Sequence, residues 1–277
     1  MRKTKEAQHA LHNDKSLADF HFILGQEPSC FLMDGEVKLP GTNPRWARFV
    51  PDGRKKRQPP VRSCIWASRE IAVTQLRADS ADITAVMAYI NQRRILIVSV
   101  YIPDLCWKRS KEENSEKLTS RLEVINRLVE TELLRDPHTE VVIAGDFNRH
   151  NPLWGGSHVG SAPRQEESEP IIEFMAERSL QSLLPAGALT YQSDVGRAPT
   201  IDLILTTPGL ASDLAKCSIW EHEYGSDHRA ICTRFWMDTS KEEVQERLLF
   251  KNAPWDKIRE AVQRQKEAGF YAIPIPP

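Results

Sequence analysis

The stretch that most constrains this fold is residues 141–148, an apolar run that ends in Gly145 and is followed by Asp146 and Asn148. Alternate residues of an extended chain point the same way, so a strand that ends here presents the carboxylate and the carboxamide side by side. A carboxylate can take a proton from water, and an amide can hydrogen-bond a phosphate oxygen, so the pair suits phosphoester chemistry. A strand end with a polar turn explains the same residues, and their partners elsewhere in the chain decide between the two interpretations.

Composition limits the class of protein. The chain has 277 residues, 40% of them hydrophobic and 27% charged, as in globular domains, and its net charge of −1 indicates no bulk attraction to nucleic acid. Five scattered cysteines without a Cys-x-x-Cys pair argue against a disulfide framework or a zinc site and favour a reducing compartment. No apolar run reaches the roughly 20 residues needed to span a bilayer, and the N-terminus lacks the core of a signal peptide. We therefore expect an intracellular protein with no membrane partner.

The apolar pattern predicts a mixed α and β domain followed by a charged helical segment. Helices are expected at 4–18, 115–134 and 169–178, and the stretch 30–62 reads as loop. Strands are expected at 20–24, 63–67, 71–76, 83–90, 95–102, 141–146, 200–205, 217–220 and 230–236. The composition shifts near residue 238, so we predict one domain at 1–238 and a helical extension or linker at 239–277.

Polar groups recur at the ends of these strands or inside them. Glu27 and Tyr101 each follow an apolar run, and Asp202 lies within one, where a carboxylate is costly unless it is paired or belongs to a site. Asp227 and His228 precede the last strand. Each has an ordinary structural explanation when taken alone: a surface loop, a core aromatic or a polar turn. Gathered at one sheet edge, the carboxylates would bind Mg²⁺, and the histidine would neutralise charge on a phosphate.

A basic cluster interrupts the loop-like stretch, at Arg54, Lys55, Lys56 and Arg57. Such a run can contact phosphates, act as a nuclear import signal or simply form a solvated loop. The nucleus is accordingly a candidate compartment.

Five segments, in order, resemble the motifs of the endonuclease/exonuclease/phosphatase superfamily, which includes DNase I and the apurinic/apyrimidinic endonucleases. They are Gln26-Glu27-Pro28, Val100-Tyr101-Ile102-Pro103, Gly145-Asp146-Phe147-Asn148, Ile201-Asp202-Leu203-Ile204-Leu205 and Ser226-Asp227-His228. The segment 150–156, His-Asn-Pro-Leu-Trp-Gly-Gly, is similar to the endonuclease domain of non-LTR (LINE-type) retrotransposons. The end of the chain is similar to the segment that leads from that domain to the reverse transcriptase.

The resemblance implies a fold, an activity and a set of roles. The fold would be a four-layer α/β sandwich of the DNase I type, two packed and mostly antiparallel sheets flanked by helices. The activity would be Mg²⁺-dependent hydrolysis of DNA phosphodiester bonds, with Mn²⁺ as an alternative metal, to nick the target of retrotransposition. In the site, Glu27 and Asp227 would bind the metal, Asp146 would act on the attacking water, and Asn148 and Tyr101 would contact the phosphate. His228 would stabilise the charge on the phosphate and would be held by Asp202. The residues expected to contact DNA are Arg54, Lys55, Lys56, Arg57, Trp154 and Ser226.

One departure from the family pattern is expected to matter. Members of the superfamily begin with a strand that carries an asparagine, and here the sequence at Met1 resembles the stretch just after it. We therefore expect a fold without that first strand and an activity that its loss can impair. Two other functions remain open: a phosphomonoesterase of the same fold, and an inactive remnant that binds nucleic acid through the basic cluster and through Arg93 and Arg94.

Overall fold

A computed structural model describes residues 4–34, 36–40, 43–51, 61–105, 110–156, 159, 166–192, 199–237 and 260 of the chain. By their contacts the residues group into two units, Met1–Thr239 and Ser240–Pro277, and the fold described below is that of the first. Among the described helices, none combines the length and the apolar character needed to cross a bilayer.

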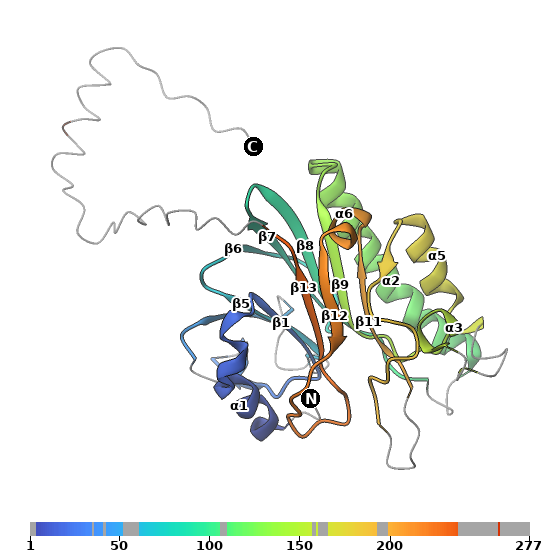
Figure 1. The fold of residues 1–277 in the computed structure, drawn as a ribbon, viewed down its shortest axis with the longest axis horizontal. Coiled ribbons are helices and arrows are strands. Elements are labelled where there is room, and N and C mark those ends of the chain that lie inside the picture. Colours follow the sequence, from blue (N-terminus) through green and yellow to red (C-terminus); the bar gives the residue numbers. More distant parts are fainter. Residues whose placement is uncertain are drawn as a thin grey trace. The chain divides into compact units, whose positions relative to one another are not determined.

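A six-stranded sheet forms the centre of this unit (Figure 1). Its strand order is β10-β11-β9-β8-β7-β6, and β8 pairs with β9 in parallel while the other neighbours are antiparallel. The strands are β6 (Ala72–Leu76), β7 (Ile83–Ile90), β8 (Arg93–Tyr101), β9 (Glu140–Asp146), β10 (Gln181–Ser182) and β11 (Asp202–Thr206). The β7–β8 hairpin turns through Asn91 and Gln92, whose φ angles of 49° and 62° suit a two-residue turn.

Helix α2 (Lys111–Arg135) makes the crossover that the parallel pair β8 and β9 requires. It begins at a capping box, in which the Ser110 hydroxyl accepts from the Glu113 amide and the Glu113 carboxylate accepts from the Ser110 amide. With α5 (Glu169–Glu177) and α3 (Pro152–Gly155), it covers one face of the sheet (Figure 1). Its buried apolar face is formed by Leu118, Leu122, Ile125 and Val129.

A second layer of strands packs on the other face of the six-stranded sheet. It contains the sheet β1-β5-β4 and the separate hairpin β12–β13, and the small hairpin β2–β3 stands apart from both. The bounds are β1 (Phe22–Gln26), β2 (Phe31–Met33), β3 (Glu36–Lys38), β4 (Trp46–Phe49), β5 (Ser63–Ser68), β12 (Leu214–Ile219) and β13 (Ile231–Phe235), with the short α6 (Pro208–Ser212) before β12. Ile65 of β5 and Phe235 of β13 both pack against the core residues of β7 and β8.

Helix α1 (Lys5–Asn13) forms a fourth layer, outside the β1-β5-β4 sheet. Its His12 contacts Trp66 of β5, and every residue of β5 is buried because α1 covers one face of it and the large sheet covers the other. The order helix, sheet, sheet, helices is the four-layer sandwich that the resemblance implies.

β1 lies at an edge of its sheet, and β13 belongs to the separate two-stranded sheet β12–β13. β1 pairs with β5 on one side, and β13 pairs with β12, but β1 and β13 belong to different sheets. Among the described residues α1 is the first element, so none of them forms a strand ahead of it. The expected loss of a first strand stays a prediction.

Some local expectations need correction. The stretch 30–62, expected to be loop, contributes β2, β3 and β4 within its described residues. The expected helix 4–18 divides at Asp14 into α1 and a 3₁₀ turn, η1 (Lys15–Asp19), because the Asp14 side chain accepts from the Ser16 amide and caps the new turn.

His12 sets an expected pH dependence of stability. His12 is 7% exposed, its ring packs edge-on against Trp66, and neither ring nitrogen has a hydrogen-bond partner among the described residues. Burial, together with the nearby charges of Arg48 and His9, lowers the pKa of His12 to about 4 from its usual 6.5. Between these two values the unfolded chain takes up a proton that the folded chain does not, so stability is present above pH 6.5 and is lost as the pH falls toward 4.

We expect His12→Phe to remove this acid sensitivity. The difference between the pKa of His12 in the unfolded chain, 6.5, and in the folded chain, about 4, corresponds to a loss of roughly 3 kcal/mol of unfolding free energy between pH 6.5 and pH 4. Urea unfolding at a series of pH values measures the slope, with the exposed and distant His138→Phe as the control that should keep it. An unchanged slope in His12→Phe would contradict this account.

Candidate active site

Three predicted site residues form one row across neighbouring strands. In the register of the large sheet, Tyr101 at the end of β8 lies opposite Asp146 at the end of β9, and Asp146 lies opposite Asp202 at the start of β11. Side chains at equivalent positions of paired strands share a face, and the alternation along β8 and β9 turns this row toward the second layer. The strand register therefore brings together a phenol and two carboxylates that are far apart in the sequence.

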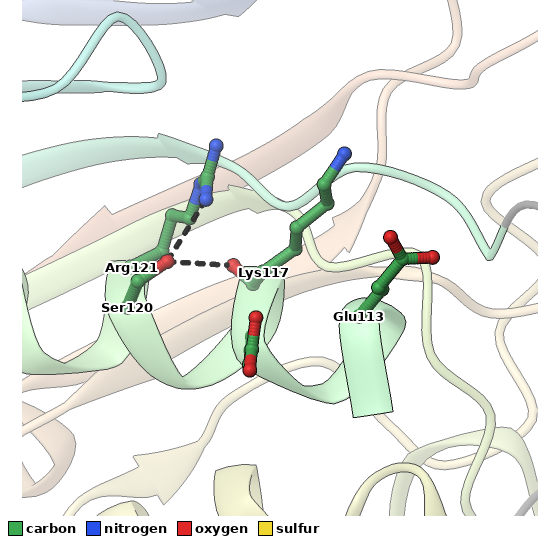
Figure 2. Close-up of a pocket in the computed structure, with 5 residues that line it drawn as sticks. Glu113, Lys117, Ser120 and Arg121 are labelled. Carbon is green, nitrogen blue, oxygen red and sulfur yellow. Dashed lines mark hydrogen bonds between the residues drawn. The ribbon is translucent and has the colours of Figure 1, made fainter. Parts of the chain in front are cut away.

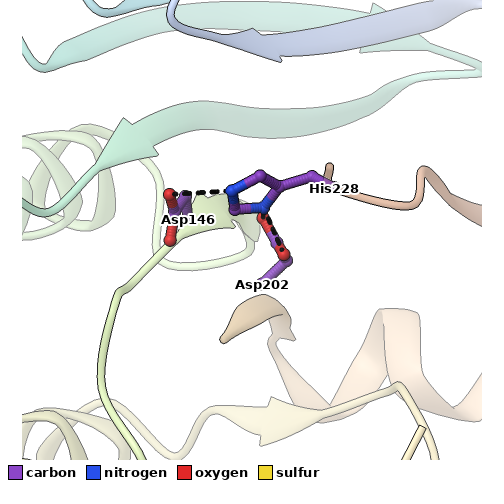
Figure 3. A group of neighbouring side chains, drawn as sticks. All are labelled: Asp146, Asp202 and His228. Carbon is purple, nitrogen blue, oxygen red and sulfur yellow. Dashed lines mark hydrogen bonds and ion pairs between the residues drawn. The ribbon is translucent and has the colours of Figure 1, made fainter. Parts of the chain in front are cut away.

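His228 completes this group from the loop before β13. Its Nδ1 atom lies 2.9 and 3.1 Å from the two carboxylate oxygens of Asp202, and its Nε2 atom lies 3.8 Å from Oδ2 of Asp146. Figure 3 shows the imidazole between the two carboxylates, with each of its nitrogens toward one of them. Because Asp202 orients Nδ1, the histidine presents Nε2 to the same space as Asp146.

The pKa values of Asp146 and His228 are both raised above their usual values. Burial and the charge of Asp202 raise the pKa of Asp146 against the opposing effect of His228. Burial disfavours the imidazolium, but the hydrogen bond and charge of Asp202 and the charge of Asp146 outweigh it, so the pKa of His228 is raised. Shifts of this kind are typical of sites that exchange protons.

Asn148 is held beside Asp146 by the bend that ends β9. Its φ angle is 48°, its amide donates to Oδ1 of Asp146 at 3.0 Å, and its side-chain Nδ2 donates to Oδ2 of Asp146 and to the carbonyl of Ile102, both at 2.9 Å. The carboxamide thus orients the carboxylate in this structure. A non-glycine residue with a positive φ angle, such as Asn148, is strained, and such strain is common in functional sites.

Glu27 follows β1 and approaches the same row from the second layer. Its amide donates to the carbonyl of Arg62 at 2.9 Å, and its φ angle of 50° marks a sharp change of direction after the strand. Burial raises the pKa of Tyr101, and the charges of Glu27 and Asp146 raise it further. Both carboxylates therefore act on the phenol of Tyr101.

The donor groups can be compared with what a metal requires. Among the described residues, Asp146, Asp202 and His228 form the group whose ligand atoms lie within 4.8 Å of one another. Nδ1 of His228 is already bonded to Asp202, and Mg²⁺ prefers oxygen ligands, so the carboxylates are the better donors. Glu27 and Asp146 both lie near enough to the Tyr101 phenol for their charges to raise its pKa. The assignment of Glu27 and Asp227 as metal ligands stays a prediction.

Two residues that sequence reasoning missed hold this group in place. The Thr190 hydroxyl accepts hydrogen bonds from the amides of Ile201 and Asp202, at 3.0 and 3.1 Å. The ring of Tyr191 lies 4.9 Å from that of His228, and the two residues form an isolated β-bridge. Both lie in an irregular segment without an apolar pattern, so no sequence signal distinguishes them.

The predicted DNA-binding residues have different outcomes. Arg54, Lys55, Lys56 and Arg57 lie outside the described residues. The hydroxyl of Ser226 accepts from the His228 amide at 3.1 Å, as in a polar turn, and its contact with DNA stays a prediction.

Trp154 requires a correction. It was expected to contact DNA, but it is 1% exposed and belongs to the core under α2. Its indole donates to the carbonyl of Arg149, and its place in the short helix α3 turns the ring inward. Its neighbour Leu153 is the exposed residue of this segment.

Arg93 and Arg94 form ion pairs with neighbouring carboxylates. Arg93 pairs with Asp213 and Glu140, and Arg94 pairs with Glu132 and Asp136. Because these acids balance their charge, the expected contribution of the two arginines to a basic surface is not supported.

Known proteins give a consistent comparison. A model of the endonuclease-reverse transcriptase family matches residues 95–232. The endonuclease domain of TRAS1, a telomere-specific non-LTR retrotransposon, superposes with a TM-score of 0.64 at 18% identity, covering 86% of this chain and 95% of that one. The 3'-5' exonuclease NExo from Neisseria meningitidis superposes with a TM-score of 0.55 at 17% identity, covering 84% and 96%. No protein among the curated sequences matches the chain.

Proposed function

Because the chain is a member of the endonuclease/exonuclease/phosphatase superfamily, with a DNase I-like fold, we propose that it hydrolyses phosphodiester bonds in DNA with the help of Mg²⁺. The observation that carries the proposal is the group formed by Asp146, Asp202 and His228 at one end of the sheet, beside Tyr101. The retrotransposon endonuclease among its structural neighbours supports target nicking as the biological setting.

Asp146 and His228 have complementary tasks in this reaction. A buried carboxylate with a raised pKa is suited to orient a water molecule and to take its proton. The imidazolium of His228, kept protonated by Asp202, places positive charge where the phosphate gains negative charge. Asn148, which holds Asp146 in the absence of substrate, can transfer a hydrogen bond to the phosphate, and the Tyr101 hydroxyl can donate a second one.

Glu27, Asp227 and Asp146 are the residues that would hold the cation. A divalent ion supplies charge neutralisation of the phosphate and of the departing oxygen. Mg²⁺ usually keeps several water ligands and is bound through only a few protein carboxylates. Carboxylates from separate elements would therefore leave coordination positions for water and for the substrate phosphate.

The expected result is metal-dependent nicking of DNA. Supercoiled plasmid should become open circular in Mg²⁺ or Mn²⁺, stay supercoiled in EDTA, and become nicked again when Mg²⁺ is restored in excess. Agarose electrophoresis over time measures the conversion. Plasmid that stays supercoiled after prolonged incubation with either metal would contradict the proposal, and binding without cleavage would then favour a non-catalytic role.

A second candidate substrate is a terminal phosphate on DNA. The structure of a 3' phosphatase from Neisseria, bound to a product DNA hairpin, superposes with a TM-score of 0.54 at 16% identity, covering 83% of this chain and 95% of that one. The same carboxylates and histidine would serve a phosphomonoester. Release of phosphate from a 3'-phosphorylated hairpin, without nicking of plasmid, would favour this candidate over an endonuclease.

A further inference from the structure

A buried carboxylate outside the catalytic row is held by two arginines. Asp82, the residue just before β7, is 1% exposed. Its carboxylate accepts from Nε and Nη2 of Arg62 at 2.7 and 2.9 Å, and from Nε and Nη2 of Arg121 at 2.9 and 2.7 Å. The guanidinium of Arg62 forms a two-pronged pair with both carboxylate oxygens, whereas both nitrogens of Arg121 donate to Oδ2 alone.

The cluster formed by Asp82, Arg62 and Arg121 contacts Tyr101 in two ways. The carbonyl of Asp82 accepts from the Tyr101 amide at 2.8 Å, which fixes the main chain where β8 ends. The guanidinium carbon of Arg62, held by Asp82, lies 4.8 Å from the centre of the Tyr101 ring, which fixes the side chain. A cation over an aromatic face at this distance is attractive and restricts the ring.

Arg121 joins Asp82 from helix α2 and uses all three of its side-chain nitrogens in hydrogen bonds. Its Nη1 atom donates to the hydroxyl of Ser120 at 2.9 Å, while its other donors face Asp82. Figure 2 shows Arg121 and Ser120 joined by this bond in a polar hollow of α2, with Lys117 and Glu113 beside them. The hydrogen bonds of Arg121 to Asp82 therefore tie helix α2 to the residue that precedes β7.

Arg62 differs from Arg121 because it also touches the catalytic layer. Its side chain is 23% exposed, and its carbonyl receives the amide of Glu27 at 2.9 Å. One residue thus connects the predicted metal ligand Glu27, the buried anchor Asp82 and the ring of Tyr101. A buried ion pair is weak support for stability alone, since its desolvation offsets much of its attraction.

We propose that Asp82 and Arg62 are positioning residues, which hold the ring of Tyr101 in the orientation that its contact with the substrate phosphate requires. Asp82 acts through Arg62, and Arg121 keeps Asp82 in place from α2. This role rests on the proposed function only where it concerns the phosphate. The orientation of the ring is a property of the free protein.

Arg62→Lys tests the proposal because lysine keeps the charge and loses the planar fork. We expect kcat for plasmid nicking to fall by about 10- to 100-fold, since a small misplacement of a reacting group has effects of this size. KM should change by less than about 2-fold, because a nonspecific nuclease is expected to hold a long DNA through many phosphates besides the scissile one. In a Tyr101→Phe background, the same substitution should cost less than about 2-fold, since its effect passes through the Tyr101 hydroxyl.

A second measurement does not depend on activity. In aromatic ¹H–¹³C NMR spectra, the Tyr101 ring signals, assigned by their loss in Tyr101→Phe, should shift or broaden in Arg62→Lys. The matched control is Arg77→Lys, since Arg77 makes an ion pair with Asp79 at the surface, with both side chains more than 70% exposed. Thermal unfolding establishes that each variant is folded, and Asp82→Asn gives a second test of the anchor.

The outcomes are separable. Multiplicative losses in the double variant, or Tyr101 signals that Arg62→Lys leaves unmoved, would overturn the positioning role. A wild-type protein that does not nick DNA, but whose Tyr101 signals respond to Arg62→Lys, would overturn the proposed function and support the positioning of the ring.

Discussion

Asp146→Ala is expected to abolish nicking, with a loss of at least about 10³-fold in kcat, the scale seen when a central catalytic group is removed. The substitution removes the carboxylate that lies between Asn148, His228 and Asp202 and that is suited to take the proton of water. Initial rates of plasmid relaxation with Mg²⁺ measure the effect. Asp79→Ala, which removes an exposed carboxylate, is the control and should leave the rate unchanged.

The same substitution should leave the fold intact. Two neighbouring carboxylates with little exposure repel each other, and burial raises the pKa of Asp146, so its removal relieves an unfavourable charge. We expect the free energy of unfolding of Asp146→Ala to stay within about 1 kcal/mol of the wild-type value or to rise, as is usual when a catalytic group is removed. A folded variant with full activity would exclude Asp146 from the reaction.

Gly145→Ala is expected to have the largest effect on stability. Gly145 lies opposite Val100 in the parallel pairing of β8 and β9, and a Cβ atom there would lie 1.8 Å from the carbonyl oxygen of Val100. The neighbour is main chain in the central sheet, so it cannot yield without breaking the pairing. We expect a loss of at least about 3 kcal/mol in the free energy of unfolding, or failure to fold.

Gly225→Ala separates this collision from a change in backbone freedom. Gly225 has a φ angle of 70°, but a Cβ atom there would have no neighbour within 4 Å. The control should lose only about 1 kcal/mol, the cost of a left-handed conformation for alanine. Urea unfolding compares the two, and a loss in Gly145→Ala as small as that of the control would contradict the close approach of the strands.

Most strands could be predicted because a strand and its turn depend on the residues of the segment itself. The apolar runs around Ile97 and Ile143 and the polar turn at Asn91 each carry their own signal. The polar residues at strand ends could also be chosen, since a carboxylate such as Asp202 in an apolar strand needs an explanation. Their convergence into one row was inferred from a family pattern, because register is set by long-range pairing that no local sequence signal carries.

Other features could not be predicted because they depend on tertiary contacts. A tryptophan in a glycine-rich segment reads as exposed, yet Trp154 is drawn into the core by the short helix α3. Arg62 and Asp82 are ordinary charged residues in the sequence, and only the fold brings the guanidinium over the ring of Tyr101. Thr190 and Tyr191 support Asp202 and His228 from a segment without a periodic pattern.

The row formed by Tyr101, Asp146 and Asp202 also limits how the length of this chain can vary. Because side chains alternate along a strand, adding or deleting one residue within β9 would turn Asp146 to the helix-covered face and expose the apolar side of the strand to the other layer. One such change would damage the core and the site together. Insertions and deletions among relatives of this protein therefore belong in the connections between strands, where they leave this alternation unchanged.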